Sequence, residues 1–288
     1  MRAVHGRCAR IALLVFLTGC AVQETKSRLS LEHLTVDAKA PAATLDLLFD
    51  PGTPSPRPII LLLGSLKLEE PPEWSLGLLA RGFALAAFNV AHPSDPDPSR
   101  RAQWLVFDER FAHGYALGAS RAAVDAGRVI DFMATRKDLD ASRIGWIGTS
   151  STGIPALAAA TTEKRIKAVV VFVSTGALDA WFRTWRENGL WVGRTQDIWP
   201  ETRELLGDVD PVRHAEGLWP AAVLMVSGAE DKVVDPRSTR AFFEAARPAY
   251  KGAPDELRFV LYEGHGHNLP ADLVRMHAED WFRRHLTP

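Results

Sequence analysis

Short uninterrupted apolar runs alternate with longer segments of mixed polarity along most of this chain. Each run is four to nine residues long and is bounded by turn residues, which is typical of a strand buried on both faces of a parallel sheet. Two earlier segments, 31–37 and 44–50, have the shorter alternation of opening strands. The runs that predict buried strands are 59–63, 83–90, 143–148, 166–174, 221–228 and 257–264.

The segments between these runs have the spacing of amphipathic helices, with apolar residues three and four positions apart. The predicted helices are 73–82, 113–136, 154–161, 238–249 and 271–286. Strands that alternate with helices in this way predict a doubly wound α/β domain, in which helices cover both faces of a mostly parallel sheet. We expect one such domain over residues 31–288.

One segment, residues 178–219, breaks this alternation. It lies between two predicted strands and is too long for a simple connection. It is also rich in tryptophan, with Trp181, Trp185, Trp191, Trp199 and Trp219 among the nine of the chain. We expect this segment to form an inserted lid.

The first twenty residues have a basic start, an apolar centre and a small-residue end, in the manner of a signal peptide. The end, Leu17–Cys20, reads LTGC and resembles a bacterial lipobox. The resemblance implies that residues 1–19 are removed, that Cys20 carries lipid and that residues 20–30 are a tether. Because Ala21 follows in place of aspartate, it also implies the outer rather than the inner membrane of the cell envelope. The alternative is a plain secretory signal with an incidental cysteine.

Composition and charge limit the possible partners. The 288 residues are 47% hydrophobic and carry a formal net charge of −1, so no basic footprint for nucleic acid is present. Cys8 and Cys20 are the only cysteines, and both lie in the signal region. We therefore expect no disulfide in the folded body, no metal site and no cofactor, while the oligomeric state stays open.

The hexapeptide GTSSTG, residues 148–153, lies where a predicted strand meets a predicted helix. A serine at the tip of such a turn needs small residues two positions before and after it, because the turn is tight. Ser150 at the tip has Gly148 before it but Thr152 after it, whereas Ser151 has Thr149 before it and Gly153 after it. Since the strand leads directly to Ser150, we predict that Ser150 is the nucleophile and that Ser151 begins the helix.

An acidic residue and a histidine follow two later strands. Asp231 comes after the strand 221–228, and His267 comes after the strand 257–264. Ligands bind at the carboxyl ends of strands in open α/β sheets, so we expect Ser150, Asp231 and His267 to meet there. His265 and Asp235 are alternatives for the base and the acid, although Asp235-Pro236 is also typical of a helix start.

The chain from about Leu45 onward resembles the α/β-hydrolases, closest to the branch of dienelactone hydrolases, acetyl-esterases and prolyl-oligopeptidase-like enzymes. The resemblance rests on the elbow, on DPVRHAEGLWPAAVLMVSGAEDKVVDP around the acid and on LYEGHGHNL around the histidine. It implies a catalytic triad of Ser150, Asp231 and His267. Thr152, in place of the usual glycine, and Pro155, early in the elbow helix, depart from the family pattern.

The resemblance also implies an oxyanion hole and a reaction. Backbone N–H groups of Ser151 and Ser65, or of Leu66 instead of Ser65, would bind the developing negative charge. We expect a cofactor-free serine hydrolase that takes a small-molecule acyl substrate and cleaves carboxylic esters through an acyl-enzyme. A peptidase or thioesterase with the same triad is the alternative within enzymes. A lipoprotein that kept the fold and lost catalysis, and that binds a ligand or partner, is the alternative outside them.

Overall fold

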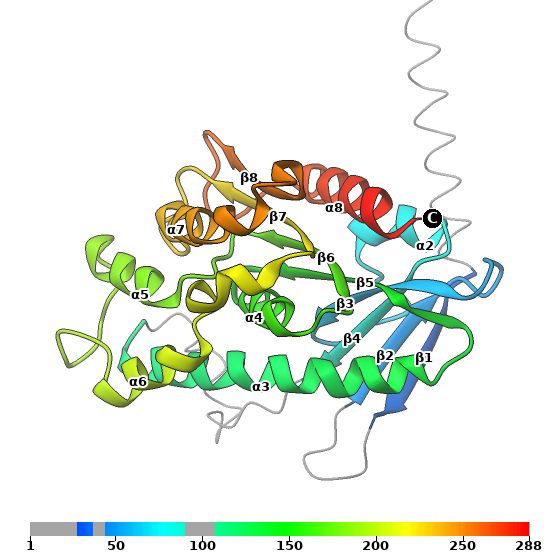
Figure 1. The fold of residues 1–288 in the computed structure, drawn as a ribbon, viewed down its shortest axis with the longest axis horizontal. Helices are drawn as coiled ribbons and strands as arrows, with labels where there is room; N and C mark the ends of the chain where they lie inside the picture. The colour runs from blue at the N-terminus through cyan, green and yellow to red at the C-terminus, as the bar shows by residue number, and fades with distance from the viewer. Residues whose placement is uncertain (1–27, 37–43, 90–106, 288) are drawn as a thin grey trace, which may run out of the picture.

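The computed structural model describes residues 28–36, 44–89 and 107–287. Its centre is an eight-stranded sheet in the order β1-β2-β4-β3-β5-β6-β7-β8 (Figure 1). The signal peptide, Cys20 and most of the tether lie outside the described residues. The strands are β1 (Ser30–Thr35), β2 (Thr44–Phe49), β3 (Arg57–Leu63), β4 (Ala84–Asn89), β5 (Leu139–Thr149), β6 (Ile166–Phe172), β7 (Ala222–Gly228) and β8 (Leu257–Tyr262).

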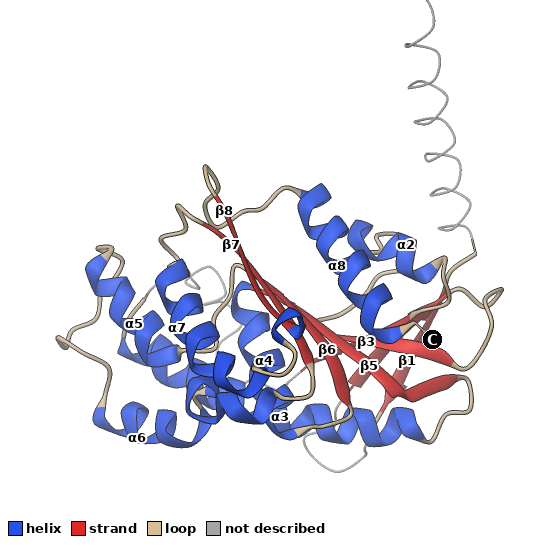
Figure 2. Cartoon of the chain, turned by 45° about the horizontal axis from the view of Figure 1, so that its top comes forward, coloured by secondary structure: helices blue, strands red, loops and turns tan. Residues whose placement is uncertain are grey.

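The sheet is mostly parallel. Strands β1, β2 and β4 pair antiparallel, and every pair from β4 through β3 to β8 is parallel. Helices cover both faces, with α3, α4 and α7 on one and α2 and α8 on the other (Figure 2). The predicted doubly wound α/β fold is confirmed. The helices are α2 (Leu76–Leu79), α3 (Glu109–Ala134), α4 (Gly153–Thr162), α5 (Leu178–Glu187), α6 (Pro200–Val209), α7 (Pro236–Ala246) and α8 (Ala271–Leu286).

The continuous apolar runs are buried because both faces of the sheet are covered. Alternate residues of one strand therefore belong to different layers: Trp146 packs toward α3 and α4, and Ile147 packs toward α8. Burial of each large apolar side chain stabilises the fold by about 1.5–3 kcal/mol, so these two layers supply most of the stabilisation.

The insertion, residues 178–219, forms α5, α6 and a 3₁₀ segment, η4 (Pro211–Leu218). Three of its tryptophans, Trp181, Trp185 and Trp191, contribute to a third apolar cluster, which includes the first turns of α3. Trp185 is fully buried, and its ring lies 4.7 Å from that of Phe107. The Trp-rich cluster is therefore a part of the packed body.

Some boundaries differ from the prediction. Helix α3 begins at Glu109, before the predicted 113, because the Asp108 side chain accepts the N–H of Phe111 at 2.8 Å and caps the helix. Strand β5 extends back to Leu139, past the predicted 143, with a register shift against β3 between Pro58 and Ile59.

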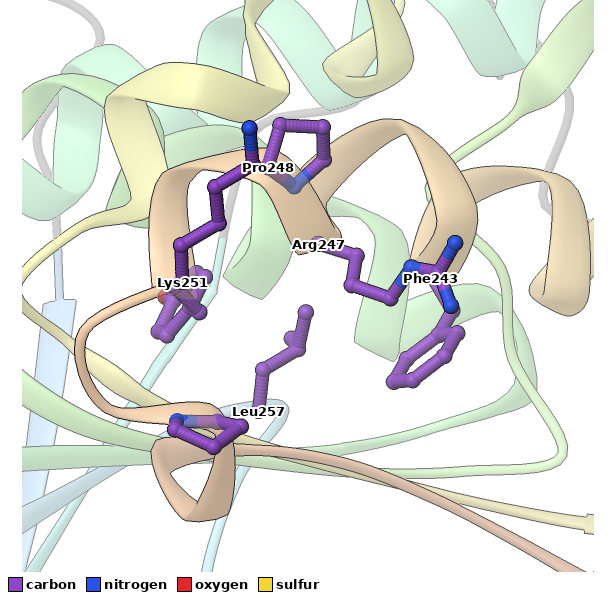
Figure 3. Close-up of a pocket in the computed structure, with 7 residues that line it drawn as sticks. Phe243, Arg247, Pro248, Lys251 and Leu257 are labelled. Carbon is purple, nitrogen blue, oxygen red and sulfur yellow. The ribbon is translucent and has the colours of Figure 1, made fainter.

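The amino ends and the carboxyl ends of the parallel strands carry different features of the molecule. The described chain begins at Arg28, whose guanidinium lies 4.0 Å from Asp50, at the amino ends of the parallel strands. A surface pocket of about 370 Å³ also lies at the amino ends of the strands, between the end of α7 and the start of β8 (Figure 3). The residues that line it include Phe243, Arg247, Pro248, Lys251 and Leu257. The predicted catalytic residues lie at the carboxyl ends of the strands.

Within the described ranges, we find no helix with the length and apolarity needed to cross a bilayer.

Candidate active site

Strand β5 ends in a sharp turn at Ser150. The φ angle of Ser150 is +52°, and a 3₁₀ turn over Ser150–Thr152 leads into α4. A non-glycine residue with positive φ is strained and is often part of a functional site. The Ser150 Oγ lies 2.9 Å from His267 Nε2. The structure thus places Ser150, and not Ser151, at the tip of the elbow.

Two glycines allow the turn to close. A Cβ added at Gly148 would lie 2.4 Å from the Cα of Gly153, and a Cβ added at Gly153 would lie 2.4 Å from the Ser174 Oγ. Both distances are far inside van der Waals contact. The second small position of this elbow is therefore three residues after Ser150 rather than two, which leaves room for a larger residue at Thr152.

Thr152 stabilises the turn through a capping box. Its hydroxyl accepts the N–H of Thr149 and donates to the carbonyl of Thr149, both at 2.9 Å, while the Thr149 side chain accepts a backbone N–H in return. Pro155 lies in the first turn of α4, where a backbone N–H has no partner within the helix. Both departures from the family pattern are therefore compatible with a regular elbow.

The acid and the base meet the serine from two neighbouring strands. Asp231 follows β7 and His267 follows β8, and His267 Nδ1 lies 2.8 Å from Asp231 Oδ2. The Asp231 side chain is fully buried, whereas that of His267 is 26% exposed. The other oxygen, Oδ1, accepts the N–H groups of Val233 and Val234 at 2.9 and 3.0 Å. Both carboxylate oxygens therefore have donors, and the carboxylate is fixed in one orientation.

The alternative residues have other partners. The Nδ1 of His265 lies 2.9 Å from the carbonyl oxygen of Glu263. Asp235 caps α7 by accepting the N–H of Arg237 at 2.9 Å. Burial alone would raise the pKa of Asp235, but the hydrogen bonds from Arg237 and Asn188 together lower it. Neither alternative residue forms a hydrogen bond with Ser150 or His267.

Backbone N–H groups near Ser150 could bind an oxyanion. Ser151 follows Ser150 within the 3₁₀ turn. The N–H of Leu66 already donates to the Asp46 carboxylate at 2.9 Å, so it is not available. Ser65 follows β3, which is the parallel neighbour of β5. Among the described residues, nothing accepts the N–H of Ser65. The structure therefore favours Ser65 over Leu66 for the second donor.

Sequence reasoning missed one contact of the elbow. The hydroxyl of Tyr115, on α3, donates to the carbonyl of Ser151. Burial raises the pKa of Tyr115 well above its ordinary value, so the phenol stays protonated and can donate at any physiological pH. In the sequence, Tyr115 is indistinguishable from the other apolar positions of its helix. As for metals, the described ranges contain no group of three or more His, Cys, Asp or Glu residues suited to bind one.

The sequence also matches a known protein family. Residues 109–287, more than half of the chain, match the prolyl oligopeptidase family. The chain belongs to the prolyl oligopeptidase family. The matched residues include Ser150, Asp231 and His267.

Individual relatives include esterases and peptidases. The Bacillus subtilis protein named "Putative esterase YitV" is 28% identical over 152 residues, which are 51% of this chain and 59% of that protein. The acetyl xylan esterase 1 of Thermoanaerobacterium sp. JW/SL YS485 has a TM-score of 0.61 at 16% identity, over 94% of this chain and 93% of the esterase. The acylaminoacyl peptidase of Pyrococcus horikoshii has a TM-score of 0.64 at 16% identity, over 90% of this chain but only 42% of the peptidase.

These matches assign the chain to a family and a fold. The chain spans about three-fifths of the length of its curated relative, and its structural neighbours share its α/β-hydrolase fold.

Proposed function

We propose that this chain is a serine hydrolase that cleaves carboxylic esters, with Ser150 as nucleophile, His267 as general base and Asp231 as the carboxylate that orients His267. The observation that carries the proposal is the continuous pair of hydrogen-bond distances, 2.9 Å from Ser150 to His267 and 2.8 Å from His267 to Asp231. A nucleophile, a base and an orienting acid in contact are the parts that acyl transfer needs.

The proposed reaction follows from these positions. Ser150 Oγ attacks the ester carbonyl, and His267 Nε2 takes the hydroxyl proton. The N–H groups of Ser151 and Ser65 stabilise the negative oxygen of the tetrahedral intermediate. His267 returns the proton to the leaving alcohol, and water then cleaves the acyl-enzyme by the same steps. Asp231 stabilises the imidazolium that forms in each half-reaction.

The extent of the structural matches supports an ester rather than a peptide. The chain matches the acetyl xylan esterase over nearly the full length of both chains, whereas it covers only 42% of the acylaminoacyl peptidase. The family match favours peptide cleavage as the second candidate, because the same triad can cleave an amide.

The decisive experiment combines a fluorophosphonate probe with a substrate panel. We expect the probe to label the purified chain, and we expect turnover of p-nitrophenyl esters to exceed turnover of matched peptide and thioester substrates. Ser150→Ala should reduce turnover about 10⁴- to 10⁶-fold and abolish labelling.

Ser151→Ala is the matched control. Only its backbone N–H has a proposed role, so activity should stay within about tenfold of that of the unmodified chain. Labelling that persists in Ser150→Ala and disappears in Ser151→Ala would overturn the assignment of the nucleophile. Faster cleavage of peptides than of esters would favour the second candidate.

We also propose that the chain is a lipoprotein of the bacterial cell envelope, anchored through Cys20. The LTGC sequence at Leu17–Cys20 and the basic, apolar segment before it support this. Cys20→Ala should leave the precursor unlipidated and abolish membrane partitioning of the mature form in fractionated cells. An unmodified chain already in the soluble fraction would contradict the anchor.

A further inference from the structure

The hydrogen bonds of Asp231 lead directly into the insertion. Its Oδ1 accepts the N–H of Val233 and the N–H of Val234. Each N–H belongs to a peptide unit whose carbonyl is on the preceding residue. The two peptide units that bind Asp231 therefore present their carbonyls, of Lys232 and Val233, in the opposite direction.

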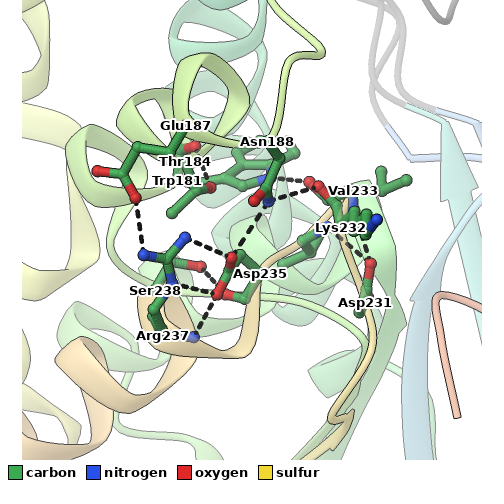
Figure 4. A network of polar contacts seen from close by, with 11 residues as sticks. Trp181, Thr184, Glu187, Asn188, Asp231, Lys232, Val233, Asp235, Arg237 and Ser238 are labelled. Carbon is green, nitrogen blue, oxygen red and sulfur yellow. Dashed lines mark hydrogen bonds and ion pairs between the residues drawn. The ribbon is translucent and has the colours of Figure 1, made fainter.

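Both carbonyls are bound by side chains of α5 and the residue that ends it (Figure 4). Asn188 Nδ2 donates to the carbonyl of Lys232 at 3.1 Å, and Trp181 Nε1 donates to the carbonyl of Val233 at 2.7 Å. Two chains of hydrogen bonds result. Asn188 is connected to Asp231 through the peptide between Lys232 and Val233, and Trp181 is connected to it through the peptide between Val233 and Val234.

Further contacts fix the insertion against the acid loop. Asn188 Nδ2 also lies 3.1 Å from Asp235 Oδ2, and Arg237 joins Glu187 to Asp235 with N–O distances of 2.7 Å to each. Figure 4 shows Arg237 between the two carboxylates. Trp181 is 2% exposed, so its hydrogen bond is shielded from competition with water. These contacts cross between segments that are far apart in the sequence.

We propose that Trp181 and Asn188 are positioning residues for the acid of the triad. They orient the two peptide units that bind Asp231, and a hydrogen bond to a carbonyl polarises the N–H on the other side of the same peptide. The inference rests on the proposed function of Asp231. It assigns the insertion a role in the reaction in addition to its packing.

The chain provides a matched pair of variants that separates this role from packing. Trp181 and Trp185 lie one turn apart on α5, are both buried and have ring centroids 4.8 Å apart. Trp185 Nε1 is buried, and no residue within the described ranges accepts its hydrogen. Trp185→Phe therefore removes the same atoms from the same cluster, but only Trp181→Phe removes a hydrogen bond to the acid loop.

We expect Trp181→Phe to lower kcat about 10- to 100-fold with KM nearly unchanged, because small displacements of a catalytic group have effects of this size. Trp185→Phe should stay within about threefold of the unmodified chain. The rate of fluorophosphonate labelling should change in the same order. Asn188→Ala should act like Trp181→Phe, and urea unfolding of each variant measures any difference in stability.

The second measurement is the proton NMR resonance of His267 Nδ1–H, which reports directly on the bond to Asp231. It should shift in Trp181→Phe and Asn188→Ala and stay in place in Trp185→Phe. Equal effects of Trp181→Phe and Trp185→Phe on kcat, or an unmoved resonance in Trp181→Phe, would overturn the inference. An unmodified chain that is neither labelled nor active would instead overturn the proposed function, and the resonance would still test the contact.

Discussion

Thr152 stands where the family usually has glycine, in a strained turn, and it stabilises that turn through its hydroxyl. Its hydroxyl makes two hydrogen bonds to the backbone of Thr149, directly before Ser150. A glycine at this position would leave the turn more room but no cap. The strain at Ser150 is therefore offset by a local capping box.

Removal of this cap should destabilise the elbow. Thr152→Val keeps the shape of the side chain and removes both hydrogen bonds, so we expect the free energy of unfolding to fall by about 1 kcal/mol. Activity should fall as well, because Ser150 would be less well oriented. Thr152→Ser, which keeps the hydroxyl, is the control in urea unfolding and ester turnover. Equal stability of the valine and serine variants would show that the box contributes nothing.

A substitution at Gly148 provides a second test of the geometry of the turn. Its added Cβ would lie 2.4 Å from backbone of Gly153, which cannot move aside as a side chain could. We expect Gly148→Ala to lower kcat/KM at least about 100-fold by displacing Ser150.

Gly127→Ala, in α3, is the control for this substitution. An added Cβ there meets nothing within 4 Å, so the variant should be as active as the unmodified chain and slightly more stable. Full activity of Gly148→Ala in the same ester assay would contradict the close packing of the elbow.

At the scale of elements, the insertion is continuous with the core. Trp185 is fully buried against α3, whereas Trp219, near the other end of the same insertion, is 43% exposed. The insertion therefore has a part around Trp185 that is packed into the body and a part around Trp219 that faces solvent.

This difference predicts unequal effects on stability. Trp185→Ala should lower the free energy of unfolding by about 3–5 kcal/mol, as for other large side chains removed from a core. Trp219→Ala should lower it by at most about 1 kcal/mol. Urea unfolding monitored by far-ultraviolet circular dichroism measures both. A small loss in Trp185→Ala would mean that α5 can leave the body without much cost.

The sequence predicts elements better than it predicts contacts between them. The apolar runs identify the parallel strands because burial on both faces leaves no polar positions in them. The direct entry of β5 into Ser150 likewise predicts the turn. Trp181 and Asn188 were not predicted as partners of the acid loop, because periodicity indicates which side chains are buried but not against what. A tryptophan that packs and one that also donates to a carbonyl look alike in a sequence.

At the scale of the molecule, two histidines of α8 link stability to pH. Burial lowers the pKa of His277 and of His285 below the ordinary value of 6.5, against the opposing charges of Asp280 and Glu256 respectively. His277 Nε2 also lies 2.8 Å from the Tyr262 hydroxyl, which donates to it while the imidazole is neutral. The folded state therefore resists protonation of both rings.

The sign follows from proton binding. Below about pH 6.5 the unfolded chain binds protons at these histidines that the folded chain does not, so stability falls as pH falls. We expect a smaller free energy of unfolding at about pH 5.5 than at about pH 7.5. The carboxylates with lowered pKa, such as Asp235, act in the same direction but only below their ordinary value of 3.8.

The double variant His277→Gln/His285→Gln is the test. Its stability should depend less on pH over this range, in urea titrations at both pH values. An unchanged pH dependence would assign the effect to other groups.

The position of Arg28 also determines how the domain faces anything attached before it. The described chain begins at the amino ends of the parallel strands, and the elbow, the acid and the histidine lie at their carboxyl ends. An attachment ahead of Arg28, whether an acyl chain, an affinity tag or a solid support, therefore joins the domain at its rear. Immobilisation through a group ahead of Arg28 should therefore leave the carboxyl ends of the strands, where Ser150, Asp231 and His267 lie, free for substrate.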